Sequence, residues 1–174
     1  MGHVLVLGGA RSGKTAFAET RALRLGQWPA YLATAEILDE EMRERVQLHQ
    51  GQRAARFHTI EEPIELGEAI RAAAEAHDVI LVDCLTLWIT NLIMADRTVA
   101  DAVDELVETL EATHVPVILV SNEVGLGIVP DNAMARMFRD LAGAAHQRLA
   151  EICDEAYFVV AGLPMTLKGG VVAN

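Results

Sequence analysis

Short runs of branched apolar residues alternate with longer stretches of mixed polarity along the whole chain. Runs of this length and composition predict buried β-strands that end in turns. Five such runs are VLVLGG (4–9), AYLATA (30–35), VILVDC (79–84), VPVILVSN (115–122) and AYFVVAG (156–162). The segment RFHTIEEP (56–63) predicts a further short strand that leads into a turn.

The stretches between these strands have helical spacing. Helices are predicted over residues 13–25, 38–49, 64–76, 85–94, 98–113 and 132–152. The acidic helix 98–113 carries an apolar stripe of Val99, Val103, Leu106 and Leu110. The alternation predicts an α/β fold, with an open, mostly parallel sheet flanked by helices. We expect residues 1–174 to form a single domain, with ligands at the carboxyl ends of the strands.

Composition and charge narrow the possible functions. Hydrophobic residues make up 52% and aromatic residues 5% of the chain, which suits strands of Val, Ile and Leu buried on both faces. The formal net charge of −11 argues against nucleic-acid binding, so any anion site must be a local one. The two cysteines lack metal-ligand spacing and indicate reduced thiols. Without a signal peptide or an apolar run that could span a bilayer, we expect a cytoplasmic protein.

The segment GGARSGKT (8–15) matches the phosphate-loop pattern G-x-x-x-x-G-K-[ST]. Such a loop wraps backbone N–H groups around a phosphate, and the helix that follows adds its positive amino-terminal end. In this pattern Lys14 reaches the β- and γ-phosphates, and the Thr15 hydroxyl binds Mg²⁺. The alternative is a glycine-rich turn with an exposed lysine. A preceding apolar strand and a following helix favour nucleotide binding through Gly8, Gly9, Ala10, Arg11, Ser12, Gly13, Lys14 and Thr15.

Acidic and amide side chains follow the ends of two other predicted strands. Asp83 is a candidate for the carboxylate that helps to hold the metal, although it could also cap the helix that begins near Leu85. Asn122 and Glu123 end a neighbouring predicted strand and point toward the same edge of the sheet.

Among the six histidines, His49 has the most informative setting. It follows Met42 and Val46 at helical spacing, which by itself favours a packed structural histidine. The segment QGQR (50–53) adds a loop and a cation that could face a phosphate. A neutral imidazole is also a competent nucleophile toward phosphorus. The residues alone leave both interpretations open.

Five segments together resemble the adenosylcobinamide kinase/adenosylcobinamide-phosphate guanylyltransferase family. They run in colinear order over almost the whole chain: GGARSGKT (8–15), YLATAEILDEEMRERVQLHQGQR (31–53), TLWITNL (86–92), SNEVGLGIVPDNAMARMFRDLAGAAHQRLA (121–150) and AYFVVAGLPMTLK (156–168). SNEVGLGIVP is far more specific than a phosphate loop alone. The resemblance implies a RecA-like phosphate-loop fold and a tendency to form homotrimers.

The resemblance also implies two activities. One phosphorylates the aminopropanol hydroxyl of adenosylcobinamide with ATP or GTP. The other transfers GMP from GTP to adenosylcobinamide phosphate, through a guanylyl-histidine at His49, and gives adenosylcobinamide-GDP and pyrophosphate. His49 and Lys14 are the expected catalytic residues, with Mg²⁺ held by Thr15 and Asp83. The implied nucleotide contacts are residues 8–15 with Ala33, Thr34, Ala35, Gln50, Gly51, Gln52, Arg53, Glu61 and Asp83.

The chain departs from the family pattern at two places. Family members often carry two adjacent histidines where this chain has Leu48 and His49, and the tail GGVVAN (169–174) has no recognised counterpart. Two other functions remain as alternatives. One is a phosphate-loop kinase for a small molecule, with a structural His49, and the other is a nucleotide-dependent switch or assembly ATPase.

Overall fold

A computed structural model describes residues 2–35 and 56–169. Within these residues, seven strands form one sheet in the order β3-β2-β4-β5-β1-β6-β7. The strands are β1 Val4–Gly8, β2 Pro29–Ala33, β3 His58–Glu61, β4 Val79–Asp83, β5 Val117–Asn122, β6 Glu155–Val160 and β7 Leu163–Lys168. All neighbouring strands pair in parallel except β6 and β7, which are antiparallel. The predicted α/β fold with a mostly parallel sheet is confirmed.

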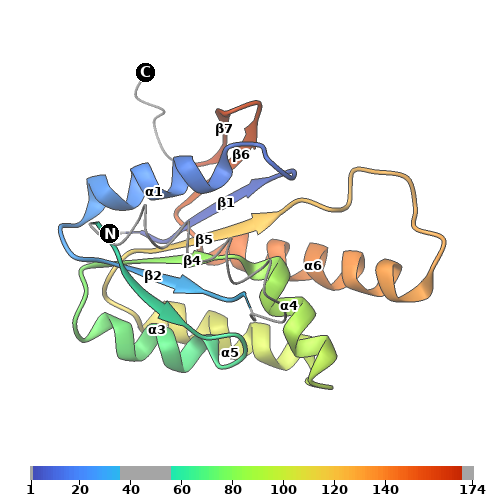
Figure 1. The fold of residues 1–174 in the computed structure, drawn as a ribbon, viewed down its shortest axis with the longest axis horizontal. Coiled ribbons are helices and arrows are strands. Elements are labelled where there is room, and N and C mark those ends of the chain that lie inside the picture. Colours follow the sequence, from blue (N-terminus) through green and yellow to red (C-terminus); the bar gives the residue numbers. More distant parts are fainter. Residues whose placement is uncertain (1, 36–55, 170–174) are drawn as a thin grey trace, which may run out of the picture.

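Helices cover both faces of this sheet. They are α1 Lys14–Leu25, α3 Leu66–Ala74, α4 Leu85–Met94, α5 Val99–Ala112 and α6 Ala133–Ile152. Among the helices of the described residues, Figure 1 shows α1 on one face and α3, α4, α5 and α6 on the opposite face. The predicted helix 38–49 lies outside the described residues.

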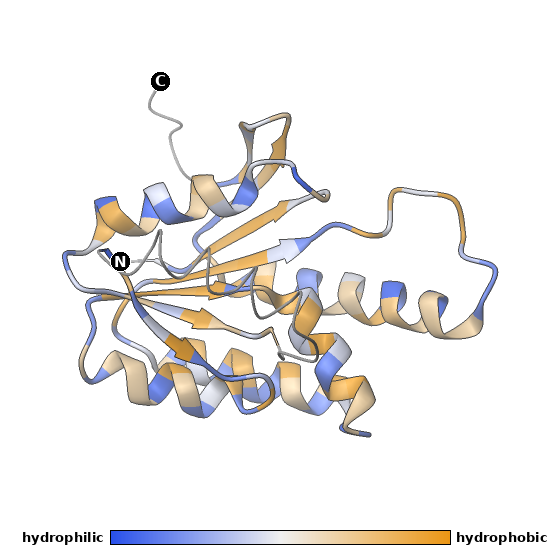
Figure 2. Cartoon of the chain, viewed as in Figure 1, coloured by the Kyte–Doolittle hydropathy of each residue, from blue (hydrophilic) through white to orange (hydrophobic). Residues whose placement is uncertain are grey.

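Alternating side chains of β1, β2, β4, β5 and β6 supply two separate cores. On the α1 face, Val4 and Val6 pack in a cluster with Ala18 and Ala22, whose small side chains let α1 approach the sheet closely. On the opposite face, Leu5 belongs to a larger cluster that includes residues of α3, α4, α5 and α6. Figure 2 shows the hydrophobic strands between these helical layers. Burial on both faces explains why the strands appear in the sequence as continuous apolar runs.

The apolar patterns of two helices are also borne out. The stripe of α5, formed by Val99, Val103, Leu106 and Leu110, is buried against the sheet and its neighbours. In α4, Trp88, Ile89 and Leu92 are buried, as the apolar composition of residues 85–94 predicts. The two helices therefore anchor the face opposite α1.

Strand β7 was not predicted from the sequence. It forms a hairpin with β6 through Ala161 and Gly162, which both have positive φ, 52° and 78°. Two-residue turns of this handedness match the twist of paired strands. The Gly162 N–H donates to the Ser12 carbonyl at 2.7 Å, so the hairpin turn lies against the phosphate loop.

The central position of β5 makes its core side chains sensitive to truncation. Leu119 is fully buried in this strand, so Leu119→Ala should lower the free energy of unfolding by about 2–5 kcal/mol, because it removes buried methyl groups and leaves a cavity. Leu163→Ala, at a residue that is 71% exposed, is the matched control and should change it by less than about 0.5 kcal/mol. Chemical denaturation of both variants checks this, and equal losses would contradict the assigned core.

Candidate nucleotide-binding site at the carboxyl edge of the sheet

The parallel register brings the ends of five strands to one edge of the sheet. Gly8 of β1 pairs with Asn122 of β5, while Ala33 of β2 pairs with both Asp83 of β4 and Glu61 of β3. The carboxyl edge of an open α/β sheet is where such folds bind ligands. Candidate residues from distant parts of the sequence therefore meet there.

The predicted phosphate loop connects β1 to α1 at this edge. Gly13 precedes the first residue of α1 with φ 91°, and Arg11 also has a positive φ of 54°. Lys14 is only 8% exposed, and its Nζ donates to the Gly9 carbonyl at 3.0 Å. The alternative of a turn with an exposed lysine is therefore wrong. Residues 11–16 line a shallow pocket of about 340 Å³, which places backbone N–H groups, a buried cation and a helix terminus together.

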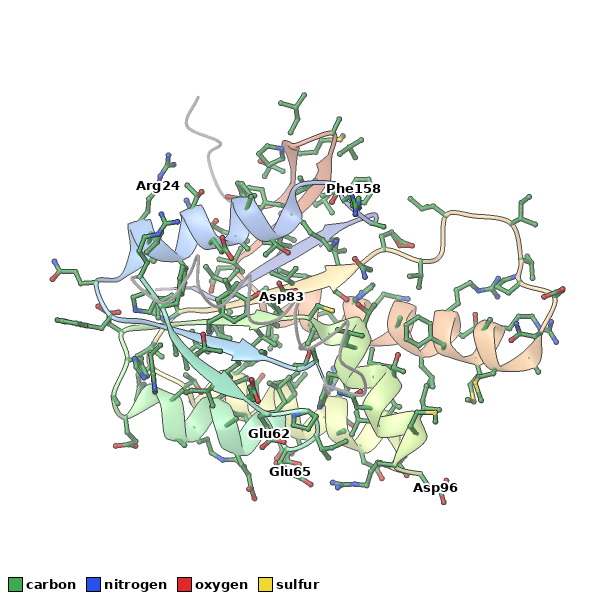
Figure 3. All side chains as sticks on the ribbon, viewed as in Figure 1. Arg24, Glu62, Glu65, Asp83, Asp96 and Phe158 are labelled. Atoms are coloured by element: carbon green, nitrogen blue, oxygen red, sulfur yellow. The ribbon has the colours of Figure 1, made fainter. Side chains whose placement is uncertain are left out.

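Asp83 lies beside this loop and accepts two side-chain hydrogen bonds. The Thr15 hydroxyl donates to its Oδ2 at 3.2 Å, and the Tyr31 hydroxyl donates to the same atom at 2.5 Å. Figure 3 shows Asp83 near the middle of the molecule, between the sheet and α1. The residue that caps α4 is Cys84, which makes no side-chain cap, so the helix-capping alternative for Asp83 is wrong.

The hydroxyl of Thr15 and the carboxylate of Asp83 are hard oxygen donors of the kind that Mg²⁺ prefers. Within the described residues, no group of three or more His, Cys, Asp or Glu side chains is arranged to hold a metal ion. A magnesium ion in a phosphate-loop protein takes only one or two protein ligands and completes its shell with phosphate oxygens and water. The Thr15–Asp83 pair fits that donor set.

Thr34 links the end of β2 to the end of β4. Its Oγ1 donates to the Cys84 carbonyl at 2.7 Å and accepts from the Cys84 N–H at 2.9 Å. Its N–H donates to the Asp83 carbonyl, and its own carbonyl accepts from Asn91 Nδ2 at 2.7 Å. The polar groups of Thr34 are thus used inside the protein, and the Ala33 carbonyl is engaged as well, since it accepts from the Glu62 N–H at 3.0 Å.

Glu61 stands at the far end of the same edge, on the exposed end of β3. Four strand spacings separate β3 from β1, which corresponds to about 19 Å at the usual spacing between strands. This places Glu61 away from the phosphate loop, where it could meet only the nucleoside end of a nucleotide. The predicted residues His49, Gln50, Gly51, Gln52 and Arg53 lie outside the described residues.

A buried polar pair near the end of β5 was missed by sequence reasoning. His146 of α6 lies with Nε2 2.7 Å from the Ser121 hydroxyl, and both residues are buried. Burial lowers the pKa of His146, and the negative charge of Glu123 offsets part of this effect. Helical spacing alone cannot show that His146 faces the strand that ends in Asn122.

Comparison with known proteins links these features to one family. A family model described as cobinamide kinase / cobinamide phosphate guanyltransferase matches residues 4–167. A bifunctional adenosylcobalamin biosynthesis protein of Pseudomonas aeruginosa is 47% identical over 95% of this chain and 96% of its own length. A protein of the same description from Salmonella typhimurium is 40% identical over 95% of this chain and 99% of its own.

Solved structures with little sequence identity share the fold. A KaiC-like protein of Pyrococcus horikoshii superposes with a TM-score of 0.52 at 13% identity and covers 90% of this chain and 70% of its own. A second protein of that organism, PH0250, gives a TM-score of 0.58 at 10% identity and covers 98% of this chain and 88% of its own. These likenesses concern the fold alone.

The lowered pKa of His146 predicts acid sensitivity. The unfolded histidine titrates near 6.5 and the folded one lower, so the unfolded state binds the proton first as the pH falls. The stability present above pH 6.5 should therefore decline as the pH drops below that value. His146→Gln should show a shallower decline between pH 7 and pH 5 in urea denaturation. Parallel curves for the two proteins would exclude this histidine as a source of acid sensitivity.

Proposed function

The chain belongs to the cobinamide kinase / cobinamide phosphate guanyltransferase family, and we propose that the carboxyl-edge site performs both reactions of this bifunctional enzyme of adenosylcobalamin biosynthesis. The first reaction phosphorylates the aminopropanol hydroxyl of adenosylcobinamide with ATP or GTP. The second transfers GMP from GTP to the resulting phosphate. The observation that carries the proposal is the buried Lys14 in a phosphate loop beside the Thr15–Asp83 pair.

Both reactions begin with a nucleoside triphosphate bound in the same way. The backbone N–H groups of residues 8–15 and the amino-terminal end of α1 surround its phosphates. Lys14 exchanges its hydrogen bond with Gly9 for one with a phosphate oxygen. Thr15 and Asp83 hold Mg²⁺, which neutralises charge on the phosphates when it is bound. Ala33 and Ala35 lie between this loop and Glu61, which receives the nucleoside end.

In the kinase reaction, the substrate hydroxyl attacks the γ-phosphorus in line with the bond to the departing diphosphate. Lys14 stabilises the charge that develops on the phosphate oxygens. The chemistry requires little more than orientation and electrostatic stabilisation from the protein, and the phosphate loop supplies both.

In the guanylyl transfer, an imidazole nitrogen of His49 attacks the α-phosphorus of GTP. A phosphorus–nitrogen bond forms, the bond between the α-phosphorus and the bridging oxygen breaks, and pyrophosphate leaves. A phosphate oxygen of adenosylcobinamide phosphate then attacks the same phosphorus and releases His49. Residues 50–53, including the cation of Arg53, contact the nucleotide during this step. The resemblance to the family supports this assignment, and it implies that the nucleotide or the His49 segment changes position between the reactions.

We expect the oligomeric state and the cellular compartment of this protein to follow the family pattern. The segment that leads from β5 into α6 exposes the apolar side chains of Leu126, Ile128, Val129, Met134 and Met137. Figure 1 shows the connection between β5 and α6 extending away from the sheet. Such a patch on a chain of net charge −11 favours contact with other protein subunits over nucleic acid, in accord with a homotrimer.

No helix of the described residues is long and apolar enough to cross a membrane. The buried thiols of Cys84 and Cys153 are unpaired, which supports a reducing compartment, the cytoplasm.

Replacing Asp83 tests the magnesium site. In Asp83→Asn a neutral amide replaces the anionic ligand, so both activities should fall by about tenfold or more at 1 mM Mg²⁺ and recover partly as Mg²⁺ increases. Asp104→Asn, at an exposed carboxylate of α5, is the matched control and should behave as wild type. Magnesium titrations of both reactions provide the measurement. An unchanged magnesium dependence in Asp83→Asn would remove Asp83 from the metal site.

Labelling tests the covalent step. The protein is incubated with Mg²⁺ and GTP labelled at the α-phosphate, then denatured. We expect label on the chain that is lost in acid and kept in alkali, as a phosphoramidate behaves. His49→Ala should carry no label and lose guanylyl transfer, whereas His114→Ala, at an exposed histidine between α5 and β5, should label normally.

The same experiment separates the alternative functions. Transfer of γ-phosphate to adenosylcobinamide without α-label would indicate a kinase with a structural His49. Nucleotide hydrolysis with neither transfer would indicate a switch or assembly ATPase. Label of normal intensity on His49→Ala would show that another residue is the nucleophile.

A further inference from the structure

Asn122, the last residue of β5, carries an unsatisfied acceptor at the carboxyl edge. Its Oδ1 is buried and has no hydrogen-bond partner within the described residues. The backbone around it is well held, since the next N–H, of Glu123, donates to the Gly8 carbonyl at 3.0 Å. Asn122 therefore sits in a fixed position with one polar atom unused.

The sheet places Asn122 on the strand between the two strands that lead to the phosphate site. Strand β5 lies between β4, which ends in Asp83, and β1, which leads into the phosphate loop. Ile118 and Val120 of β5 pack in the core on the α1 face, so by the two-residue period of a strand Asn122 projects from that same face. Asp83 projects there as well and meets Thr15 of α1. The Asn122 side chain thus leaves the sheet on the face that carries the Thr15–Asp83 pair, from the strand between β4 and β1.

Two other asparagines make structural hydrogen bonds through their side chains. Asn91 donates to the carbonyls of Thr34 and Pro63, at 2.7 and 3.0 Å. Asn132 accepts from the Ala135 N–H and caps α6. A buried acceptor without a donor is unfavourable, and in native proteins such an atom marks a catalytic role, a strained site or a bound water or ion. Among the described residues, the buried side-chain atoms without a partner are Asn122 Oδ1, the Ser12 hydroxyl of the phosphate loop and Arg21 Nε, so two of the three lie at the carboxyl edge.

We propose that Asn122 is a positioning residue of the kinase reaction, where its side-chain oxygen accepts a hydrogen bond from the substrate hydroxyl that attacks the γ-phosphorus. This role rests on the proposed kinase function of the same site. An amide is no base, so it orients the nucleophile without taking the proton. The oxygen–phosphorus bond forms, the bond to the β–γ bridging oxygen breaks, and the hydroxyl proton passes to a transferred phosphoryl oxygen and then to water.

The two reactions should depend on Asn122 differently. The nucleophile of the kinase reaction is a hydroxyl, which has a hydrogen to donate. The acceptor of the guanylyl group is a phosphate monoester, whose oxygens carry a hydrogen in only a small fraction of molecules at neutral pH. Loss of the Asn122 acceptor should therefore slow the first reaction and spare the second.

The test compares three variants in both assays. Asn122→Leu keeps the size of the side chain and removes the acceptor, so kcat of the kinase reaction should fall about tenfold to a hundredfold while KM for ATP changes less than twofold. Guanylyl transfer should stay within about twofold of wild type. Asn122→Asp keeps an acceptor, so its kinase kcat should recover toward wild type, with a raised KM for ATP because of the added negative charge. Asn132→Ala is the control, which should lower Tm and leave the ratio of the two activities unchanged.

Each other outcome overturns the role. Equal losses of both activities in Asn122→Leu would indicate a structural residue. No loss of either activity would show that Asn122 has no role in the reactions. An Asn122→Asp variant as slow as Asn122→Leu would show that acceptance of a hydrogen bond is not the contribution. Wild-type protein that transfers GMP but no γ-phosphate would overturn the proposed kinase function, and this role with it. A normal wild-type kinase with an unaffected Asn122→Leu overturns the role of Asn122 alone.

Discussion

The phosphate loop is fixed by contact between its own backbone and that of the C-terminal hairpin. A Cβ atom at Gly13 would lie 2.9 Å from the Cα of Gly162, too close for any side chain. The Gly162 N–H donates to the Ser12 carbonyl, and at the other end of the loop the Glu123 N–H donates to the Gly8 carbonyl. Strands β6 and β5 thus restrain the loop on either side of β1. The burial of Lys14 depends on this restraint, because a looser loop would expose it.

Much of this arrangement could be predicted because parallel strands buried on both faces leave continuous apolar runs in the sequence. The end of such a run is also the end of a strand, so Asp83 could be placed at the carboxyl edge from VILVDC alone. The phosphate loop needs glycines at fixed offsets, and these are equally visible. Local patterns of this kind account for most of the described elements and for the core of the site.

Other features depend on contacts between distant residues, which no local pattern records. Strand β7 alternates apolar and polar residues, but Pro164 weakens that strand signal, and the apolar side chains of Leu163, Met165 and Leu167 are exposed. Its turn places an alanine at positive φ, which is not a usual turn signal. The role of Thr34 rests on bonds to residues some 50 positions away. The unsatisfied atom of Asn122 can be recognised only once every neighbour is placed. The proposed role of His49 rests on the family resemblance, since its helical spacing alone favours a structural residue.

The acidic composition of the chain and its anion site are compatible because the charges act locally. Exposed arginines on and between the helices are engaged by carboxylates, as in Arg71–Glu105, Arg97–Glu65 and Arg148–Asp104, and such surface pairs contribute little to stability. Lys14 instead lies buried, where the lower effective dielectric strengthens its attraction to a phosphate. A triphosphate bound in this one way can react at either of two phosphorus atoms. Which of the two reactions occurs then depends on which nucleophile reaches which phosphorus atom. The residues around the loop, more than the loop itself, decide this.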